Sequence, residues 1–122
     1  MKEFEIINQS RPLAESLVAR SCDTVWCRAI GMMFRRRLPK NWGLLFDEKR
    51  DNVVTTAIGM LFVFIDLGVV WINEAGEVVD LCVAKKWVTI KAPKKPARYF
   101  LEFSPDRINE FQVGDKISFV EK

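Results

Sequence analysis

The sequence predicts a mostly β protein, arranged as an antiparallel β-sandwich or barrel with one or two short helices. About seven to nine short apolar runs are separated by turn signals at the spacing typical of such folds. Residues 53–84 form the most apolar stretch, and an Asn-Glu-Ala-Gly turn at residues 73–76 favours a hairpin within it. A chain of 122 residues fits one globular domain, residues 1–122, with a single core.

The N-terminal part is predicted to open the fold with two strands and a short helix. Residues 4–7 are apolar, and residues 13–20 return as a second, weaker strand. Ser21 and Asp23 are both suitable N-caps for a helix over residues 24–30. Because an isolated helix of this length is marginal in water, we expect it to pack on the sheet.

The middle of the chain is predicted to supply the central strands. Residues 42–46 (WGLLF) read as a strand, and residues 47–52 (DEKRDN) read as a solvated turn. Residues 60–65 are apolar on both alternating faces, which predicts a strand covered on both sides. Residues 69–72 and 77–84 are predicted to be the two arms of the hairpin.

The C-terminal part alternates more regularly. Residues 97–103 place apolar side chains on one face, so Arg98 and Glu102 are predicted to point outward. Residues 104–106 (Ser-Pro-Asp) combine an N-cap, a proline and an acid, which indicates the start of a short helix. Residues 117–120 are predicted to be the last strand.

Several stretches in one order carry a resemblance to a known family: residues 28–35 with 38–39, 43–46, 60–64 with 69–72, 76–79, 97–102 and 113–117. Together they resemble the small prokaryotic family catalogued as domain of unknown function 192, over roughly residues 8–119. The resemblance implies a jelly-roll-like β-sandwich, and it supplies no activity and no catalytic residues. Many relatives carry a histidine where this chain has Gly59 and an acid where it has Gly68.

The absence of histidine excludes several kinds of chemistry. Ser-His-Asp and Cys-His catalysis cannot be built within this chain, and the commonest zinc ligand is missing. Asp66 and Asp80 lie in or beside apolar strands, where a buried acid of raised pKa could serve acid–base catalysis, but an acid paired with a cation is the more common outcome. We therefore predict no catalytic residues, no metal site and no cofactor.

The cysteines and the N-terminus bear on the compartment. Cys22, Cys27 and Cys82 are irregularly spaced, so three reduced thiols are expected, with one disulfide as the alternative. The N-terminus has no apolar signal-peptide core. Residues 59–72 are apolar but shorter than the ~20 residues that cross a bilayer. These features predict a cytoplasmic protein outside the membrane.

Two basic segments suggest a binding surface. The net charge is +3, and residues 81–101 contain six cations and no acid, with aromatic residues interspersed. A second block, residues 35–37, is Arg-Arg-Arg. Mixed basic and aromatic residues bind phosphates and stack bases, so a polyanion such as RNA is a candidate ligand. The alternative is that the lysines flank edge strands and prevent pairing with other chains. The predicted ligand-binding residues are Arg35, Lys86, Trp87 and Arg98.

The leading functional prediction is a non-enzymatic binding or interaction module for an anionic ligand. The alternative is a small-molecule-binding protein or small enzyme that uses a pocket at one end of the sandwich, lined by Arg35, Trp87 and Arg98. A third prediction is a structural subunit that works through a protein partner or as a homodimer.

Overall fold

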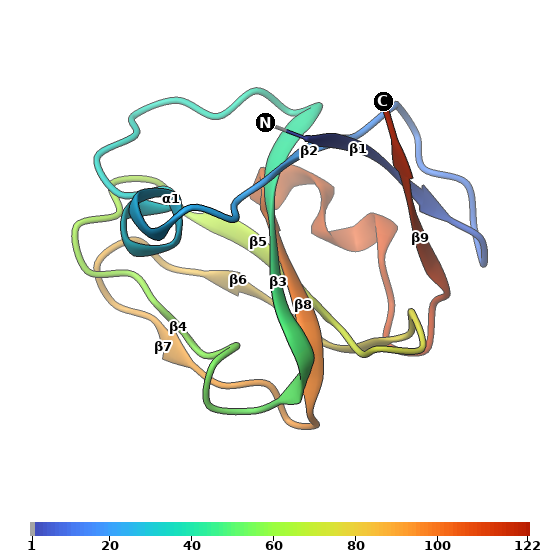
Figure 1. Cartoon of the computed structure of the whole chain (residues 1–122). Coiled ribbons are helices and arrows are strands. Elements are labelled where there is room, and N and C mark those ends of the chain that lie inside the picture. The colour runs from blue at the N-terminus through green and yellow to red at the C-terminus, as the bar shows by residue number, and fades with distance from the viewer. Residues whose placement is uncertain (1) are drawn as a thin grey trace.

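The computed structural model describes residues 2–122, which form a mixed seven-strand sheet, a separate two-strand sheet and two short helices (Figure 1). The strands are β1 (Glu3–Asn8), β2 (Val18–Ser21), β3 (Trp42–Asn52), β4 (Ile58–Gly59), β5 (Leu67–Ile72), β6 (Val78–Ala84), β7 (Ile90–Lys91), β8 (Ala97–Phe103) and β9 (Ile117–Glu121). The helices are α1 (Val25–Ile30) and the 3-10 helix η1 (Pro105–Glu110). Neither helix within residues 2–122 is long and apolar enough to cross a membrane.

The large sheet has the strand order β6-β5-β8-β3-β2-β1-β9, and β4 pairs only with β7. The prediction of a mostly β protein is confirmed. The purely antiparallel arrangement is wrong at one pair, because β2 and β3 run parallel. Their connection crosses over through α1 and the long loop after it, which gives the chain the length that a parallel pair requires. This strand order does not show a jelly roll.

The sheet curls until its two outer strands approach each other. Glu77, just before β6, forms an isolated antiparallel bridge with Lys116, just before β9. The amide of Val78 donates to the carbonyl of Asp115 (2.9 Å), and the amide of Ile117 donates to the carbonyl of Gly76 (2.8 Å). Gly76 closes the predicted hairpin between β5 and β6 with a left-handed backbone (φ 89°).

The inner strand β5, next to β6, shows that the sheet is buried on both faces there, because all six of its residues are buried. Val69 and Trp71 pack into one apolar cluster, whereas Val70 and Ile72 pack into a second. The first cluster is closed by Ile58, Met60, Val63 and Met32. Residues of β1, β9 and the end of η1 close the second. A sheet covered on both faces explains why this stretch is continuously apolar.

Residues 60–65 do not form the predicted doubly covered strand. The strand β4 ends at Gly59, and the chain then turns, with Leu61 60% and Phe62 41% exposed. Phe62 has a left-handed backbone (φ 63°), which is incompatible with a continuing strand. The strand that is buried on both sides is β5, which starts at Leu67. The apolar pattern therefore predicted that such a strand exists but assigned it to the wrong residues.

Residues 47–52 are not a turn but the second half of β3. The strand is 11 residues long, and Asn52 still pairs with Ala97 on β8. The register shifts between Asp47 and Asn52, where Lys49 has φ 75°. An irregularity of this kind lets a polar strand end twist away from the core and remain solvated.

A side-chain hydroxyl group caps the N-terminus of each of the two helices. Thr24 caps α1, since its Oγ1 accepts a hydrogen bond from the amide of Cys27 (3.1 Å), so the prediction of Ser21 or Asp23 is wrong. The predicted start of the second helix is confirmed. Ser104 caps η1 by accepting from the amide of Asp106 (3.4 Å).

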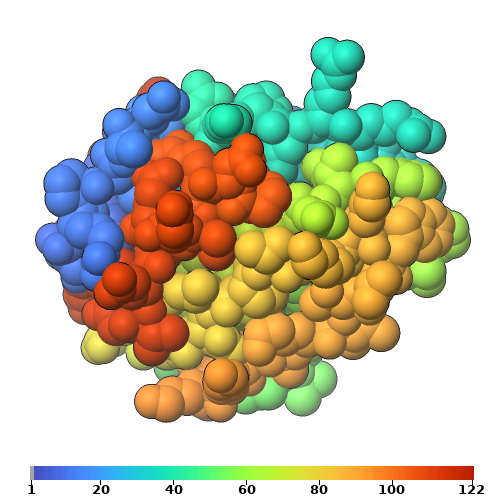
Figure 2. Space-filling model, turned by 180° about the vertical axis from the view of Figure 1, so that it is seen from behind, coloured from blue at the N-terminus to red at the C-terminus, as the bar shows by residue number. Residues whose placement is uncertain are grey.

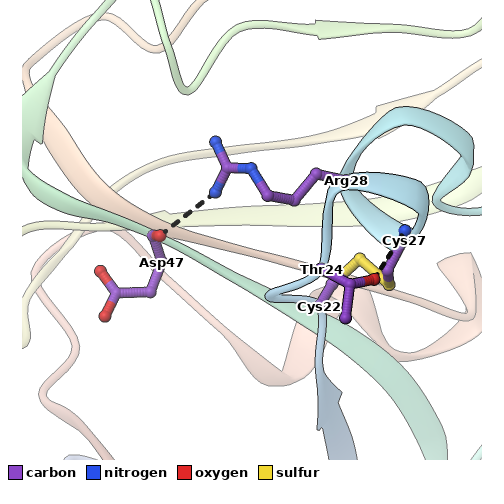
Figure 3. Close-up of a disulfide and its surroundings, with 5 residues drawn as sticks. All are labelled: Cys22, Thr24, Cys27, Arg28 and Asp47. Carbon is purple, nitrogen blue, oxygen red and sulfur yellow. Dashed lines mark hydrogen bonds between the residues drawn. A yellow bond between two sulfur atoms is a disulfide. The ribbon is translucent and has the colours of Figure 1, made fainter.

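A disulfide joins Cys22 to Cys27, which corrects the prediction of three reduced thiols. Cys22 lies just after β2, outside the helix, and the chain reverses before Cys27 in the first turn of α1 (Figure 3). The reversal brings the two Cα atoms to 5.3 Å, within the range that disulfides span. The bridge ties α1 to the end of β2, and Cys82 remains a free, half-buried thiol.

Candidate functional site

Three loops meet at one end of the molecule, the side opposite to β1 and β9 (Figures 1 and 2). They are residues 31–41, 60–66 and 85–89, and we call this region the loop end. Figure 2 shows them side by side in cyan, light green and gold. Backbone hydrogen bonds connect them: the amide of Phe34 donates to the carbonyl of Phe62 (3.0 Å), and the amide of Trp87 donates to that of Met60 (3.1 Å). The loops therefore form one surface.

Four rings from these loops form an aromatic cluster: Phe34, Phe62, Phe64 and Trp87. The rings of Phe34 and Phe62 stack with centroids 5.8 Å apart. Trp87 meets Phe62 and Phe64 edge-on, with both centroid distances at 5.2 Å. Phe34 is 59% exposed, Phe62 41% and Trp87 43%. Much of the cluster is thus open to solvent, although aromatic rings normally contribute most when buried.

Three members of the aromatic cluster have left-handed backbone conformations. Phe34 has φ 66°, Phe62 φ 63° and Trp87 φ 66°. Such a conformation costs a non-glycine residue roughly 1–2 kcal/mol. Residues kept in this region despite the cost are concentrated at ligand-binding and switching positions. The strain is therefore a reason, besides exposure, to regard the cluster as a functional surface.

A basic groove of about 340 Å³ lies beside the aromatic cluster. Arg36, Arg37, Lys86 and Phe64 line it, and the guanidinium carbon of Arg36 lies 4.9 Å from the centroid of the Phe64 ring. The one acid in its lining is Asp66, whose carboxylate accepts from the amide of Lys86 (2.9 Å). No side chain of Arg36, Arg37 or Lys86 forms an ion pair with any residue in the described part of the chain.

Of the four predicted ligand-binding residues, the structure places Lys86 and Trp87 together on the loop of residues 85–89. Trp87 belongs to the aromatic cluster and Lys86 to the basic groove. Arg35 lies on a different loop, residues 31–41, where it lines a separate pocket and stacks on Trp42, with the guanidinium carbon 4.5 Å from the ring centroid. Arg98 lies elsewhere, on β8.

Arg98 is engaged in a structural ion pair. It donates two hydrogen bonds to the Asp47 carboxylate, at 2.9 and 3.1 Å, and lies 3.6 Å from a Glu74 oxygen. Partial burial alone would raise the pKa of Asp47, but hydrogen bonds from Arg98 and the Lys49 amide outweigh it and lower that pKa. The pocket that was predicted between Arg35, Trp87 and Arg98 is therefore not assembled from these residues.

A separate, buried feature is the carboxyl group of Glu102, which was predicted to point outward. Glu102 is only 8% exposed, because it lies on β8 between Leu44 of β3 and Val69 of β5. Both faces of the sheet are covered around Glu102. The side chains of β8 still alternate between the two faces, but neither face leads to solvent there. Glu102 has no hydrogen-bond or ion-pair partner among residues 2–122. No side-chain oxygen in this part of the chain is both fully enclosed and unpaired, so the carboxyl oxygens of Glu102 reach the open space beside them. Burial raises the pKa of its carboxyl group to about 7.

Glu102 lines a cavity of about 130 Å³, which we call the Glu102 cavity. The stacked rings of Phe46 and Phe100, 4.3 Å apart, form one wall, and Met32 and Met60 are part of the remaining lining. Arg28 also lines it, but its guanidinium pairs with Glu48 (2.7 Å). Sequence patterns did not indicate this site, because only the coverage of both faces reveals it.

The two glycines that stand where the family resemblance implies a histidine and an acid, Gly59 and Gly68, have different surroundings. Gly59 lines the Glu102 cavity, and a Cβ atom added there would meet nothing within 4 Å. Gly68 lies on β5 opposite Phe103, where an added Cβ would come within 3.2 Å of the Ser104 carbonyl oxygen. Side chains are therefore accommodated at position 59 and crowded at position 68.

The remaining acids offer no catalytic pair. Asp80 is buried and lies 3.0 Å from the Lys91 ammonium. Burial alone would raise the pKa of Asp80, but hydrogen bonds from Lys91 and two backbone amides outweigh it and lower the pKa. The described residues contain no group of three or more Cys, Asp or Glu side chains that could hold a metal ion.

The comparisons with solved structures agree on the fold. A Sinorhizobium meliloti structure, described as that of "a putative transcription regulator", superimposes with a TM-score of 0.82 at 20% identity, covering 97% of this chain and 92% of the other. A protein of unknown function from Novosphingobium aromaticivorans gives a TM-score of 0.74 at 21% identity, covering 95% and 83%. At these identities the likeness concerns the fold alone.

The sequence comparisons identify relatives. A UPF0127 protein of Thermococcus kodakarensis is 32% identical over 116 residues, which cover 93% of this chain and 72% of the relative. A UPF0127 protein of Pyrococcus furiosus is 29% identical over 117 residues, covering 93% and 97%. The DUF192 family pattern, described as "Uncharacterized ACR", matches residues 6–119, so the resemblance in the sequence is confirmed. The chain therefore belongs to the DUF192 (UPF0127) family.

Proposed function

We propose that this protein binds single-stranded nucleic acid through its loop end, as a non-enzymatic binding module. The observation that carries the proposal is the contact between an exposed aromatic cluster and a groove of unpaired cations.

The aromatic cluster suits unstacked bases. Base stacking on an aromatic side chain contributes about 1–3 kcal/mol per base and tolerates any base, since every base has a π-face. Trp87 has the largest ring of the cluster, and Phe34 is its most exposed member. Backbone hydrogen bonds to Met60 and Phe62 hold these two residues in place. A fixed ring loses little conformational entropy when a base stacks on it.

The basic groove suits the phosphates of the same strand. Arg36, Arg37 and Lys86 present three cations with no acidic partner in residues 2–122. Lys91 of the same basic segment differs from Lys86, because its ammonium group is paired with Asp80 of β6 at 3.0 Å. We therefore assign the phosphate contacts to Lys86 and not to Lys91.

The test is a fluorescence-anisotropy titration with fluorescein-labelled oligouridylate and oligothymidylate at two salt concentrations. We expect binding at 50 mM NaCl that weakens steeply at 200 mM. The logarithm of the association constant should fall with the logarithm of the salt concentration, with a slope of about −0.7 for each phosphate neutralised. Trp87→Ala should weaken binding about 5- to 150-fold. Lys86→Gln should weaken binding and make the salt slope shallower by the contribution of about one phosphate contact.

Lys122→Gln is the matched control, because Lys122 is an exposed lysine at the opposite end of the sheet. It should leave both affinity and salt slope unchanged. The proposal fails if neither oligonucleotide binds at 50 mM NaCl, or if Lys122→Gln reduces binding as much as Lys86→Gln does.

A further inference from the structure

We propose that the Glu102 cavity binds a small organic cation, a primary ammonium group on a short, unbranched alkyl chain. This inference does not rest on nucleic-acid binding at the loop end, and it is tested by a separate experiment.

The charge of the ligand follows from the surroundings of Glu102. Its carboxyl group lines the cavity and is 8% exposed, with no donor from residues 2–122 to satisfy it. Its cross-strand neighbours, Leu44 and Val69, are apolar. A buried carboxyl group without donors is costly, and the cost is largest for its charged form. An ammonium group brings three N–H donors and the opposite charge, so it offsets both costs.

The only other charged residue in the cavity lining, Arg28, does not already satisfy Glu102. Its guanidinium is 2.7 Å from the Glu48 carboxylate. It also donates to the Asp47 carbonyl at 3.5 Å, as the dashed line in Figure 3 shows. Arg28 is thus neutralised by Glu48, whose side chain is 7% exposed. The carboxyl group of Glu102 therefore determines that the ligand carries a positive charge.

The size and shape of the ligand follow from the rest of the lining. The cavity measures about 130 Å³. That volume is close to the roughly 150 Å³ of an engineered apolar cavity that accepts benzene. Met32, Met60, Phe46 and Phe100 supply apolar surface, and methionine side chains adapt to flexible ligands. An alkyl chain of about four carbons fills such a space.

A matched series of probes tests the proposal: n-butylamine, n-butanol and butyrate share one alkyl chain and differ in charge. Backbone-amide NMR titrations at pH 8 should show saturable shifts with n-butylamine at Gly59, Met60 and Phe100, which line the cavity. We expect n-butanol to bind at least tenfold more weakly and butyrate not to bind. Equal affinity for n-butylamine and n-butanol, or no saturable shift with n-butylamine, would overturn the proposal.

Variants locate the interaction. Glu102→Gln keeps the shape and should reduce n-butylamine affinity at least tenfold, whereas Glu77→Gln, at an exposed acid, should not. Persistence of binding in Glu102→Gln would also overturn the proposal. The same Glu102→Gln protein should still bind oligonucleotides, which separates this test from that of the loop end.

The wild-type protein provides a test that needs no substitution. Arg28 is the only other charged lining residue, and its partner is Glu48, so Glu102 is the group that should titrate with binding. Because burial raises the pKa of Glu102 to about 7, its ionised fraction falls about 100-fold from pH 8 to pH 5. Affinity for n-butylamine should fall by a similar factor, and affinity independent of pH would contradict the assignment.

Discussion

Glu102 on β8 lies directly opposite Val69 on β5, so a carboxyl group occupies a cross-strand position next to a fully buried apolar residue. The neighbour on the other side, Leu44 on β3, is also apolar and buried. A central strand of a doubly covered sheet rarely carries an unpaired acid, because burial without a donor destabilises the fold. The chain therefore retains a feature that folding alone does not favour.

The first prediction concerns the stability of the fold as a function of pH. Burial raises the pKa of Glu102 from 4.5 to about 7. Its contribution to stability is therefore fully present below pH 4.5 and is lost as the pH rises through about 7, because only the unfolded chain ionises freely in that window. The full loss is on the order of 3 kcal/mol.

Glu102→Gln should remove this dependence. We expect the variant to be more stable than the wild type at pH 8 and to differ little from it at pH 4, as measured by urea unfolding at both values. Groups with lowered pKa values, such as Asp47 and Asp115, affect both proteins equally and cancel in the difference. A variant that is no more stable than the wild type at pH 8 would contradict the prediction.

The elements predicted best from the sequence are those determined by local chemistry. The turn at residues 73–76 depends on one glycine, and the start of η1 depends on Ser104 and Pro105. The strand β8 was predicted with its observed bounds, residues 97–103, because its apolar residues alternate. None of these depends on how distant parts of the chain are placed.

The features that sequence missed depend on tertiary context. Glu102 was predicted outward because alternation assumes one solvated face, and the second face is covered by residues far away in the sequence. Residues 60–65 resemble a buried strand, but Phe62 contributes its ring to the aromatic cluster. The disulfide was missed because irregular cysteine spacing was taken to favour reduced thiols, whereas the chain reversal that brings Cys22 to Cys27 depends on how α1 packs after β2.

The second prediction concerns Arg107, which is 5% exposed on η1. Its guanidinium donates to the carbonyls of Glu15 (2.6 Å), Ser16 (3.2 Å) and Lys40 (3.1 Å). It also donates twice to the Glu110 carboxylate, at 2.8 and 3.0 Å. One side chain thereby connects three segments that are distant in sequence.

Arg107→Met should leave these carbonyls without their guanidinium donors and the Glu110 carboxylate with only the Ala14 amide, which we expect to cost about 3–5 kcal/mol in the free energy of unfolding. Arg107→Lys should recover only part of the loss, because an ammonium group cannot reproduce the planar fork. Urea unfolding measures both. Arg37→Met, at an exposed arginine, is the control and should change stability by about 0.5 kcal/mol or less. A loss below about 1 kcal/mol for Arg107→Met would show that the network is not structural.

The third prediction concerns the disulfide between Cys22 and Cys27. Closing so short a loop stabilises the folded state by about 2 kcal/mol in the chain-entropy account. Reduction, or replacement of both cysteines by serine, should lower the free energy of unfolding by that amount. It should also speed amide exchange in α1, since a six-residue helix is marginal without an anchor. Cys82→Ser should show neither effect, and equal unfolding midpoints with and without reductant would contradict the prediction.

The fourth prediction separates strain from binding at Trp87, whose backbone has φ 66°. Glycine adopts this conformation without steric cost, whereas alanine does not. Trp87→Gly should therefore be more stable than Trp87→Ala by about 1 kcal/mol, which reverses the usual order of these two residues. Thermal unfolding of the two variants measures this difference.

Both variants lack the ring that packs against Phe62 and Phe64, so both should lose oligonucleotide affinity to the same extent. If the ring binds bases, affinity follows the loss of the ring and not the stability of the variant. If affinity instead recovers in Trp87→Gly along with stability, the ring serves the loop fold alone, and the binding site lies elsewhere on the loop end.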